Sequence, residues 1–385
     1  MNPETASSFI EIDPVLVRQN LSFIRSRLKR GVKFSAVIKG NAYGHGIEQM
    51  VPLLEKEGVR HFSVYGVEEA NQFHKCSSAG SALMVMGYID PENYETTLRR
   101  GDEFFVYDID ELKIAIAEAK RTGLKARIHL EFETGMNRTG MDESSLEEIV
   151  KLLSENKTHL YLAGICTHFA GAESISNYYR IKKQRKRFKR FLNFFKERRV
   201  EFASCHAACS AAMLRYPDTQ YDMVRSGILI YGYWPNRETL IDYITKNDLR
   251  KDPLTSVLTW RSKVMTVKEV DKGEYVGYGT SYLTNRKAKV AIVPVGYAYG
   301  YSRVLSNQGR ALVNGQRVGV IGTVNMNMLT LDVTEVEGVK KGSEVVLIGT
   351  QGEHRISVAS FGELSSQLNY ELLARLPHNI PRIIK

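Results

Sequence analysis

Eight short apolar segments that alternate with helical patterns constrain the fold of the first 235 residues. The segments are 34–40, 61–66, 82–88, 104–108, 126–134, 161–169, 202–209 and 223–232. Continuous apolar strands separated by amphipathic helices are typical of a parallel sheet with both faces covered. Eight such units predict an α/β fold with an N-terminal (β/α)8 TIM-type barrel over residues 1–245. A doubly wound open sheet is the alternative, but no GxGxxG motif follows the first strand.

The pattern changes near residue 250, where apolar segments follow one another with little helix between them. These segments are 255–270, 288–297, 310–324, 328–333 and 343–349. Glycines and charged residues separate them, as they separate the strands of a β-rich domain. We therefore predict a C-terminal β-rich domain over residues 246–385, with the segment 236–252 as the joint between the domains.

Length and composition favour a cytoplasmic enzyme. A chain of 385 residues that is 43% hydrophobic can form two domains with substantial cores. No apolar run approaches the ~20 residues of a membrane span, and the start MNPETASSFIEID lacks the features of a secretion signal. Four cysteines are too few for a disulfide framework. Cys205 and Cys209 flank His206, but no second ligand pair has suitable spacing, so we expect no metal.

The net charge of +10 has a local origin. Residues 180–199 contain eleven Lys or Arg and one Glu, an excess as large as that of the whole chain. Ile181, Phe188, Phe191, Leu192 and Phe195 keep helical spacing within this segment. The pattern predicts one amphipathic helix with a basic, solvated outer face. Because no nucleic-acid motif accompanies it, we expect no nucleic-acid partner.

Polar residues recur where the predicted barrel strands end. Active sites of such barrels lie at the C-terminal ends of the strands. The residues are Lys39 at strand one, Arg138 after strand five, His168 at strand six, His206 and Ser210 at strand seven, and Arg225 with Ser226-Gly227 in and after strand eight. A single histidine or lysine in such a position is more often structural. Together the residues form one ring, which favours an active site.

Two of these positions suit a phosphate group. Ser210 and Gly227 follow strands seven and eight, where barrels often bind phosphate. A small hydroxyl residue and a glycine let backbone N–H groups approach an anion. Lys39 adds an amine nucleophile, and the combination predicts pyridoxal phosphate held as a Schiff base. A sugar-phosphate enzyme with a Schiff-base lysine is the alternative, although it would usually need no β-rich domain.

Ordered motifs along nearly the whole chain resemble the alanine racemases, pyridoxal-phosphate enzymes with a barrel and a β domain. In the predicted barrel the motifs are FIEIDPVLVRQNL, AVIKGNAYGHG, ETGMNRTG, THFA, SAAMLRYP and MVRSGILIYG. In the second domain they are GYGTSY, VGYAYG, NMNM and LNYELLARLPHNIPR. The resemblance implies an isomerase that interconverts L- and D-alanine, with a role in D-alanine supply for the cell wall.

The resemblance also implies residue roles. Cofactor binding would involve Lys39, Tyr43, Arg138, His168, Ser210, Arg225, Gly227, Ile228 and Tyr370. Substrate binding would involve Arg138, Tyr297 and Met326. Lys39 would hold the cofactor covalently, and Arg225 would face its pyridine nitrogen. Because arginine stays protonated and can only donate there, the ring should be a weaker electron sink, which limits transamination.

Lys39 and Tyr278 would be the two catalytic bases. Racemisation removes a proton from one face of Cα and returns one to the other face, so two groups on opposite faces suit it. Lys39 would serve the D-isomer and Tyr278 the L-isomer, with His168 linking Arg225 to Tyr278. In the family the tyrosine base comes from the partner subunit, so we expect a homodimer with shared active sites and a small amino acid as substrate.

Several positions depart from the usual family pattern. They are Glu131 where a carbamylated Lys is common, Cys209 where Asn is common, Tyr299 for Asp, and Asn325 and Asn327 for Cys and Asp. The last three lie near the expected substrate entrance and leave a broader-specificity amino-acid racemase as an alternative. We predict that Glu131 pairs with Arg138, directly or through one water, in place of the carbamate.

Two other classes share part of this pattern. Barrel-fold decarboxylases use the same cofactor lysine and two-domain plan, but they typically carry a Cys-x-x-Asp motif in the second domain. All four cysteines here precede residue 210. Single-barrel cofactor-binding proteins without catalysis lack the second domain and therefore any equivalent of Tyr278.

Overall fold

The computed structural model describes residues 6–365 and 369–385, and contacts divide the chain into two units. One unit comprises residues 17–40 and 50–255, and the other comprises residues 1–16, 41–49 and 256–385. The N-terminal segment and residues 41–49 thus group with the C-terminal part by contacts. The division into domains 1–245 and 246–385 remains a prediction about functional parts.

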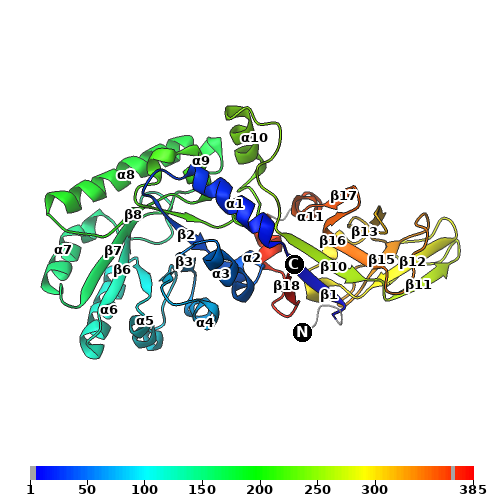
Figure 1. Cartoon of the computed structure of the whole chain (residues 1–385), viewed down its shortest axis with the longest axis horizontal. Coiled ribbons are helices and arrows are strands. Elements are labelled where there is room, and N and C mark those ends of the chain that lie inside the picture. The colour runs from blue at the N-terminus through cyan, green and yellow to red at the C-terminus, as the bar shows by residue number, and fades with distance from the viewer. Residues whose placement is uncertain (1–5, 366–368) are drawn as a thin grey trace. The chain divides into compact units, whose positions relative to one another are not determined.

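The first unit contains an eight-stranded parallel barrel, which confirms the predicted fold class (Figure 1). Its strands are β2 (Lys33–Val37), β3 (His61–Val64), β4 (Ala82–Val85), β5 (Glu103–Val106), β6 (Ala126–Glu131), β7 (Leu160–Cys166), β8 (Cys205–His206) and β9 (Met223–Ser226). Their order is β8-β7-β6-β5-β4-β3-β2-β9. Backbone hydrogen bonds of 3.0 Å from Asp222 to Cys205 and from Arg225 to Ala208 bring β9 against β8. The barrel is therefore nearly closed.

Helices follow most of these strands, as the alternating pattern predicted. Helix α1 (Pro14–Arg27) precedes β2. The helices after it are α2 (Lys39–Tyr43), α3 (Ile47–Lys56), α4 (Val67–Cys76), α5 (Tyr94–Arg100), α6 (Ile109–Thr122), α7 (Leu146–Glu155), α8 (Tyr178–Glu197), α9 (Ser210–Arg215) and α10 (Arg237–Lys246). Helix α6 illustrates the local signals: Asp108 caps its N-terminus, and Gly123 ends it with a φ of 69°. Helix α8 is the predicted basic helix, with its phenylalanines 188, 191 and 195 buried.

The second unit is β-rich, as predicted. Its strands are β1 (Ser8–Ile12), β10 (Leu258–Lys263), β11 (Thr266–Val270), β12 (Ala288–Val293), β13 (Arg310–Val313), β14 (Gln316–Gly319), β15 (Leu329–Asp332), β16 (Glu344–Gln351), β17 (His354–Ile356) and β18 (Arg382–Ile384). One sheet has the order β14-β13-β16-β10-β1-β18, with β17 on β16, and a three-stranded sheet has the order β11-β12-β15. Helices α11 (Val358–Ser365) and α12 (Asn369–Ala374) complete it.

Two local expectations need correction. Lys39 does not end a strand, because β2 stops at Val37 and α2 begins at Lys39. His168 likewise lies two residues beyond the end of β7. The segment 236–252 carries α10 and groups by contacts with the barrel unit, which continues to Thr255. Its role as the joint between the domains stays a prediction. No helix in the described part of the chain is both long and apolar enough to cross a bilayer.

Candidate active site

Lys39 begins a helical turn of unusual hand. The five residues that follow, Gly40 to Gly44, all have φ between 51° and 77°. A left-handed helical conformation costs an L-residue roughly 1–2 kcal/mol, so Asn41, Ala42 and Tyr43 are strained. Such strain persists where the surrounding structure enforces it, and it concentrates at functional sites. The sequence predicted a glycine-rich turn here but not its hand.

Side chains support this turn on both sides. The Gly40 N–H donates to Glu69 Oε1 at 2.5 Å, and the Tyr65 N–H donates to Glu69 Oε2 at 2.8 Å. The ring Nδ1 of His45 lies 2.8 Å from the Tyr43 carbonyl oxygen. Burial lowers the pKa of His45 to about 4. The ring is therefore neutral near pH 7 and donates from Nδ1.

The Lys39 amine lies in a cationic environment. Burial lowers its pKa, the positive charges of Arg138 and Arg225 act in the same direction, and Glu69 opposes them. The residue also keeps exposed surface. Solvent therefore reaches the side chain. A lysine with a lowered pKa is a better nucleophile and base near neutral pH.

Arg225 is held by the ends of two neighbouring strands. It is 5% exposed. Its Nη2 donates to the Thr167 carbonyl oxygen at 2.9 Å, and its Nη1 donates to His206 Nδ1. His206, which the sequence placed in the ring of site residues, therefore contacts Arg225. No carboxylate in residues 6–365 and 369–385 forms an ion pair with Arg225 within 4.0 Å.

His168 lies in the electrostatic field of the same group of cations. Burial lowers its pKa to about 3, and the positive charges of Arg225, Arg138 and Lys39 contribute. The imidazole is therefore neutral over the physiological range. The positive charges of Arg138 and Arg225 act on both Lys39 and His168, so these four predicted residues lie within electrostatic reach of one another.

Ser210, Gly227 and Ile228 lie where β8 and β9 lead into their loops. The Ser210 Oγ is 2.9 Å from the Ser226 Oγ and accepts a hydrogen bond from the Gly227 N–H at 3.2 Å. Ser210 also starts α9, and Ile228 follows Gly227 directly. A hydroxyl group and a backbone amide in this arrangement can bind the oxygens of a phosphate.

In the second unit, the loops that carry Tyr278, Tyr297 and Met326 are tied together. The Tyr297 N–H donates to the Asn325 carbonyl oxygen at 3.0 Å. The Thr323 hydroxyl donates to the Tyr278 carbonyl oxygen at 3.3 Å. The side chains of Tyr278, Tyr297 and Met326 are exposed in the single chain, and Tyr278 is 73% exposed. In the same unit the rings of Tyr43 and Tyr370 lie 5.9 Å apart.

Two family models match the chain. One is described as "Alanine racemase, N-terminal domain" and covers residues 12–235, and the other as "Alanine racemase, C-terminal domain" and covers residues 257–384. The chain belongs to the alanine racemase family. The resemblance stated from the sequence motifs is thereby confirmed.

Individual members of the alanine racemase family match over nearly their full lengths. The alanine racemase of Leptospira interrogans is 35% identical over 99% of this chain and 96% of its own. That of Halothermothrix orenii is 33% identical over 99% and 97%. The crystal structure of the Bacillus anthracis enzyme with bound L-Ala-P is 30% identical, covers 100% of this chain and 96% of its own, and superposes with a TM-score of 0.90.

Glu131 stands where the family usually has a carbamylated lysine. It does not form the direct ion pair with Arg138 that we predicted. The buried Glu131 accepts a hydrogen bond from the Thr139 hydroxyl at 2.8 Å. Among residues 6–365 and 369–385, no ion pair within 4.0 Å joins Glu131 to Arg138. The direct form of the prediction is therefore wrong, because the strand that ends at Glu131 directs the carboxylate toward Thr139.

Glu133, which the sequence analysis did not select, organises the Arg138 loop. Its carboxylate accepts hydrogen bonds from consecutive backbone N–H groups of residues 135 to 138, including 2.7 Å from Met136 and 2.8 Å from Asn137. Asn137 has a φ of 57°. One carboxylate thus folds the loop into the conformation that presents Arg138. The ETGMNR motif contains this residue, but only the folded loop reveals its contacts.

We predict that Glu133→Ala impairs substrate binding more than cofactor binding. Without the carboxylate, the loop N–H groups would form hydrogen bonds to water and Arg138 would lose its fixed position. Misplacement of a positioning group can lower the rate by up to about a hundredfold. Steady-state kinetics should record a raised KM for alanine. Glu131→Gln, which alters the neighbouring carboxylate that contacts Thr139, is the matched control. Equal effects of the two substitutions would contradict this assignment.

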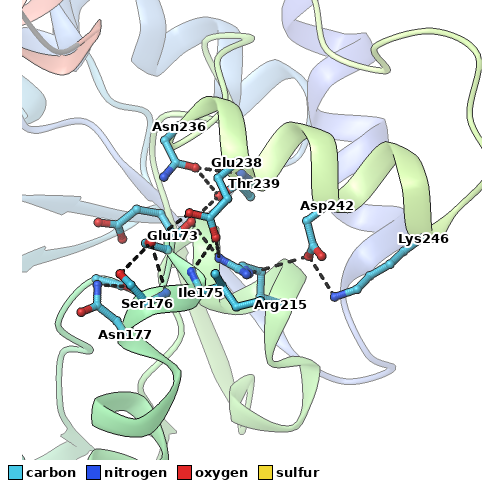
Figure 2. A network of polar contacts seen from close by, with 12 residues as sticks. Glu173, Ile175, Ser176, Asn177, Arg215, Asn236, Glu238, Thr239, Asp242 and Lys246 are labelled. Atoms are coloured by element: carbon cyan, nitrogen blue, oxygen red, sulfur yellow. Dashed lines mark hydrogen bonds and ion pairs between the residues drawn. The ribbon is translucent and has the colours of Figure 1, made fainter.

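Figure 2 shows a polar network that anchors the loop after β7 to α9 and α10. The Glu238 carboxylate of α10 accepts hydrogen bonds from the Ser174 hydroxyl at 2.9 Å and the Ile175 N–H. Arg215, at the end of α9, donates to Glu238 at 3.1 Å and to the Glu173 carbonyl oxygen at 2.8 Å. The network ties the loop that begins near His168 to the helix that begins at Ser210.

Proposed function

We propose that the protein interconverts L- and D-alanine with pyridoxal phosphate bound covalently to Lys39. The observation that carries the proposal is the cluster of Lys39, Arg138, His168 and Arg225 at the barrel strand ends. Family membership supports the same activity. The broader-specificity racemase and the decarboxylase are not favoured, because the relatives described above are named alanine racemases.

The residues present fit this cofactor. Lys39 offers an amine of lowered pKa, Arg225 offers a buried guanidinium, and Ser210 with Gly227 offers a hydroxyl and an amide. Tyr43, Ile228 and Tyr370 would complete phosphate binding. When bound, pyridoxal phosphate withdraws electron density from the substrate and acidifies its Cα proton. Arg225 would donate to the pyridine nitrogen, and Arg138 would bind the substrate carboxylate.

Proton transfer falls to two side chains. Lys39 takes or returns the proton on one face of Cα, and Tyr278 does so on the other. His168, which burial keeps neutral, would link Arg225 to Tyr278. Tyr297 and Met326 border the substrate entrance. The enzyme is cytoplasmic and supplies D-alanine for the cell wall.

The proposal requires a homodimer, because Tyr278 serves the partner's Lys39. Its support is the exposure in one chain of the loops that hold the second base. Exposed large apolar side chains there include Tyr275, Tyr278, Leu283, Tyr297, Val304, Met326 and Met328. Apolar surface of this kind is typical of an interface.

A racemisation assay tests the activity. Polarimetry over a panel of L-amino acids should record loss of rotation with L-alanine, and little with larger side chains. Rapid racemisation of several large amino acids would show that the protein is a broader-specificity amino-acid racemase instead. No racemisation of any amino acid, by protein loaded with pyridoxal phosphate, would exclude the proposal.

Lys39→Ala should abolish covalent attachment of the cofactor. In the wild-type protein, borohydride treatment followed by proteolysis should leave the reduced cofactor on the peptide that contains Lys39, as seen by mass spectrometry. The substituted side chain has no amine, so the variant should bind pyridoxal phosphate only reversibly. A reduced adduct on another lysine would overturn the assignment. Lys33, an exposed residue of β2, provides the control substitution Lys33→Ala.

Mixing two inactive variants tests the shared site. When Lys39→Ala and Tyr278→Phe subunits are mixed, half of the dimers are hybrids, and each hybrid has one site with both bases intact. About a quarter of wild-type activity should therefore return. If each subunit used its own Lys39 and Tyr278, no activity would return, and the shared-site arrangement would be wrong.

A further inference from the structure

A chain of buried hydrogen bonds leads from Arg225 to a carboxylate in a different strand. The Arg225 Nη1 donates to His206 Nδ1. The His206 Nε2 lies 2.8 Å from His129 Nδ1, and the His129 Nε2 lies 2.9 Å from Glu103 Oε2. The four residues come from β9, β8, β6 and β5. Both imidazoles are at most 1% exposed.

The chemistry of the two ends fixes the direction of every bond in this chain. Arginine can only donate, and an ionised carboxylate can only accept. A neutral imidazole donates from one nitrogen and accepts at the other. His206 must therefore carry its proton on Nε2, and His129 must also carry its proton on Nε2. Both rings then present a bare Nδ1 toward Arg225.

The charges along the chain agree with this assignment. Burial lowers the pKa of both His129 and His206, so both rings are neutral. Burial alone would raise the pKa of Glu103, but hydrogen bonds from His129, His61 and Arg127 hold it below its ordinary value. The chain thus has a cation at one end, an anion at the other and two neutral rings between them.

Phe105 shields the chain from water. Its ring centroid lies 6.1 Å and 6.0 Å from those of His129 and His206, and 5.7 Å from the Arg225 guanidinium carbon. A buried cation without a paired anion is costly. Since no carboxylate contacts Arg225 directly within the described residues, the anion at the far end of the chain is the one linked to it.

We infer that Glu103 is a positioning residue for Arg225. It acts as the remote counter-charge, and it aligns His129 and His206 so that a bare imidazole nitrogen holds the guanidinium. The inference rests on the proposed function in one respect, that Arg225 faces the pyridine nitrogen. Nothing in the sequence pattern links Glu103 to the site, because the link runs through three other strands.

A double-mutant cycle on the cofactor-free protein tests the coupling. Glu103 and Arg225 share no direct contact, so independent effects should add. We expect Glu103→Gln to weaken the folding equilibrium about tenfold more in the wild type than in Arg225→Gln, measured by urea unfolding. Glu55 is a largely buried carboxylate that accepts hydrogen bonds from the Ser78 N–H and the Ser81 hydroxyl. The control Glu55→Gln should change the folding equilibrium equally in the wild type and in Arg225→Gln. Additive effects of Glu103→Gln would overturn the inference.

Substitutions of His129 test transmission even if Glu103→Gln fails to fold. A glutamine amide accepts at its oxygen and donates from its nitrogen, so His129→Gln can pass the same polarity along the chain. His129→Leu cannot. The double-mutant cycle should still show coupling between Arg225 and Glu103 in His129→Gln. It should show none in His129→Leu. Equal behaviour of the two variants would contradict the chain.

Two further readouts separate positioning from general stability. In cofactor-free protein with ¹⁵N-labelled histidine, His206 and His129 should both be protonated on Nε2 at pH 7, and protonation on Nδ1 in either ring would overturn the inference. In the loaded enzyme, Glu103→Gln should lower kcat about tenfold or more with KM for alanine nearly unchanged. A loaded wild type without racemase activity would reject the proposed function, while the cofactor-free measurements would still decide this inference.

Discussion

Tyr278→Phe should reduce racemisation by about 10²- to 10⁴-fold, the usual contribution of a positioned acid–base group. The substitution keeps the ring and removes only the hydroxyl that carries the proton. Because Lys39 remains, exchange of the α-proton with solvent should survive better for D-alanine than for L-alanine. Proton NMR in D₂O measures the exchange of each isomer separately.

The neighbouring Tyr275 provides the matched control for this result. It is 53% exposed and lies on the same loop region of the second unit. Tyr275→Phe should leave racemisation and both exchange rates close to those of the wild type. Equal loss of exchange for both isomers in Tyr278→Phe would show that Tyr278 is not a base for one face.

The cofactor-free protein should lose several kcal/mol of unfolding free energy between about pH 6.5 and pH 4. His45 is fully buried with a pKa of about 4, and His168 has a pKa of about 3, against an ordinary value of 6.5. Below pH 6.5 the unfolded chain binds protons that the folded state excludes, so stability falls as the pH falls. His45 alone accounts for about 3 kcal/mol at pH 4. Urea unfolding at a series of pH values measures the slope.

His45→Asn should flatten this pH dependence. An asparagine amide can still donate to the Tyr43 carbonyl oxygen, but it does not titrate. His354, exposed on β17, gives the control His354→Asn, which should keep the full wild-type slope. An unchanged slope in His45→Asn would mean that His45 does not resist protonation in the folded protein.

Local patterns predicted the parts of this protein that depend on burial. The alternation of apolar and amphipathic segments predicted the barrel, because each strand and helix must bury one apolar face whatever its neighbours are. The helical spacing of phenylalanines in residues 180–199 predicted α8 for the same reason. Ordered motifs predicted the family and the residues Lys39, Arg138, His168 and Arg225, which the barrel brings together.

Local patterns failed where a residue's partner lies far away in the chain. The segment 8–12 forms β1 because it pairs with β10 and β18, both in the last third of the chain. The left-handed turn after Lys39 depends on Glu69 and His45, which no propensity of residues 40–44 reveals. Glu131 was a reasonable partner for Arg138 by spacing, but Glu133 holds the loop.

The sequence by itself determined the fold class, the family and the chemical types of the residues that converge on the barrel strand ends, because hydrophobic periodicity and motif order are local properties. Only the tertiary structure decided which carboxylate acts on which cation. The links from Glu103 through His129 and His206 to Arg225 exist because four strands are in register around a nearly closed barrel. Register is set by packing of the whole sheet, so no single segment encodes it.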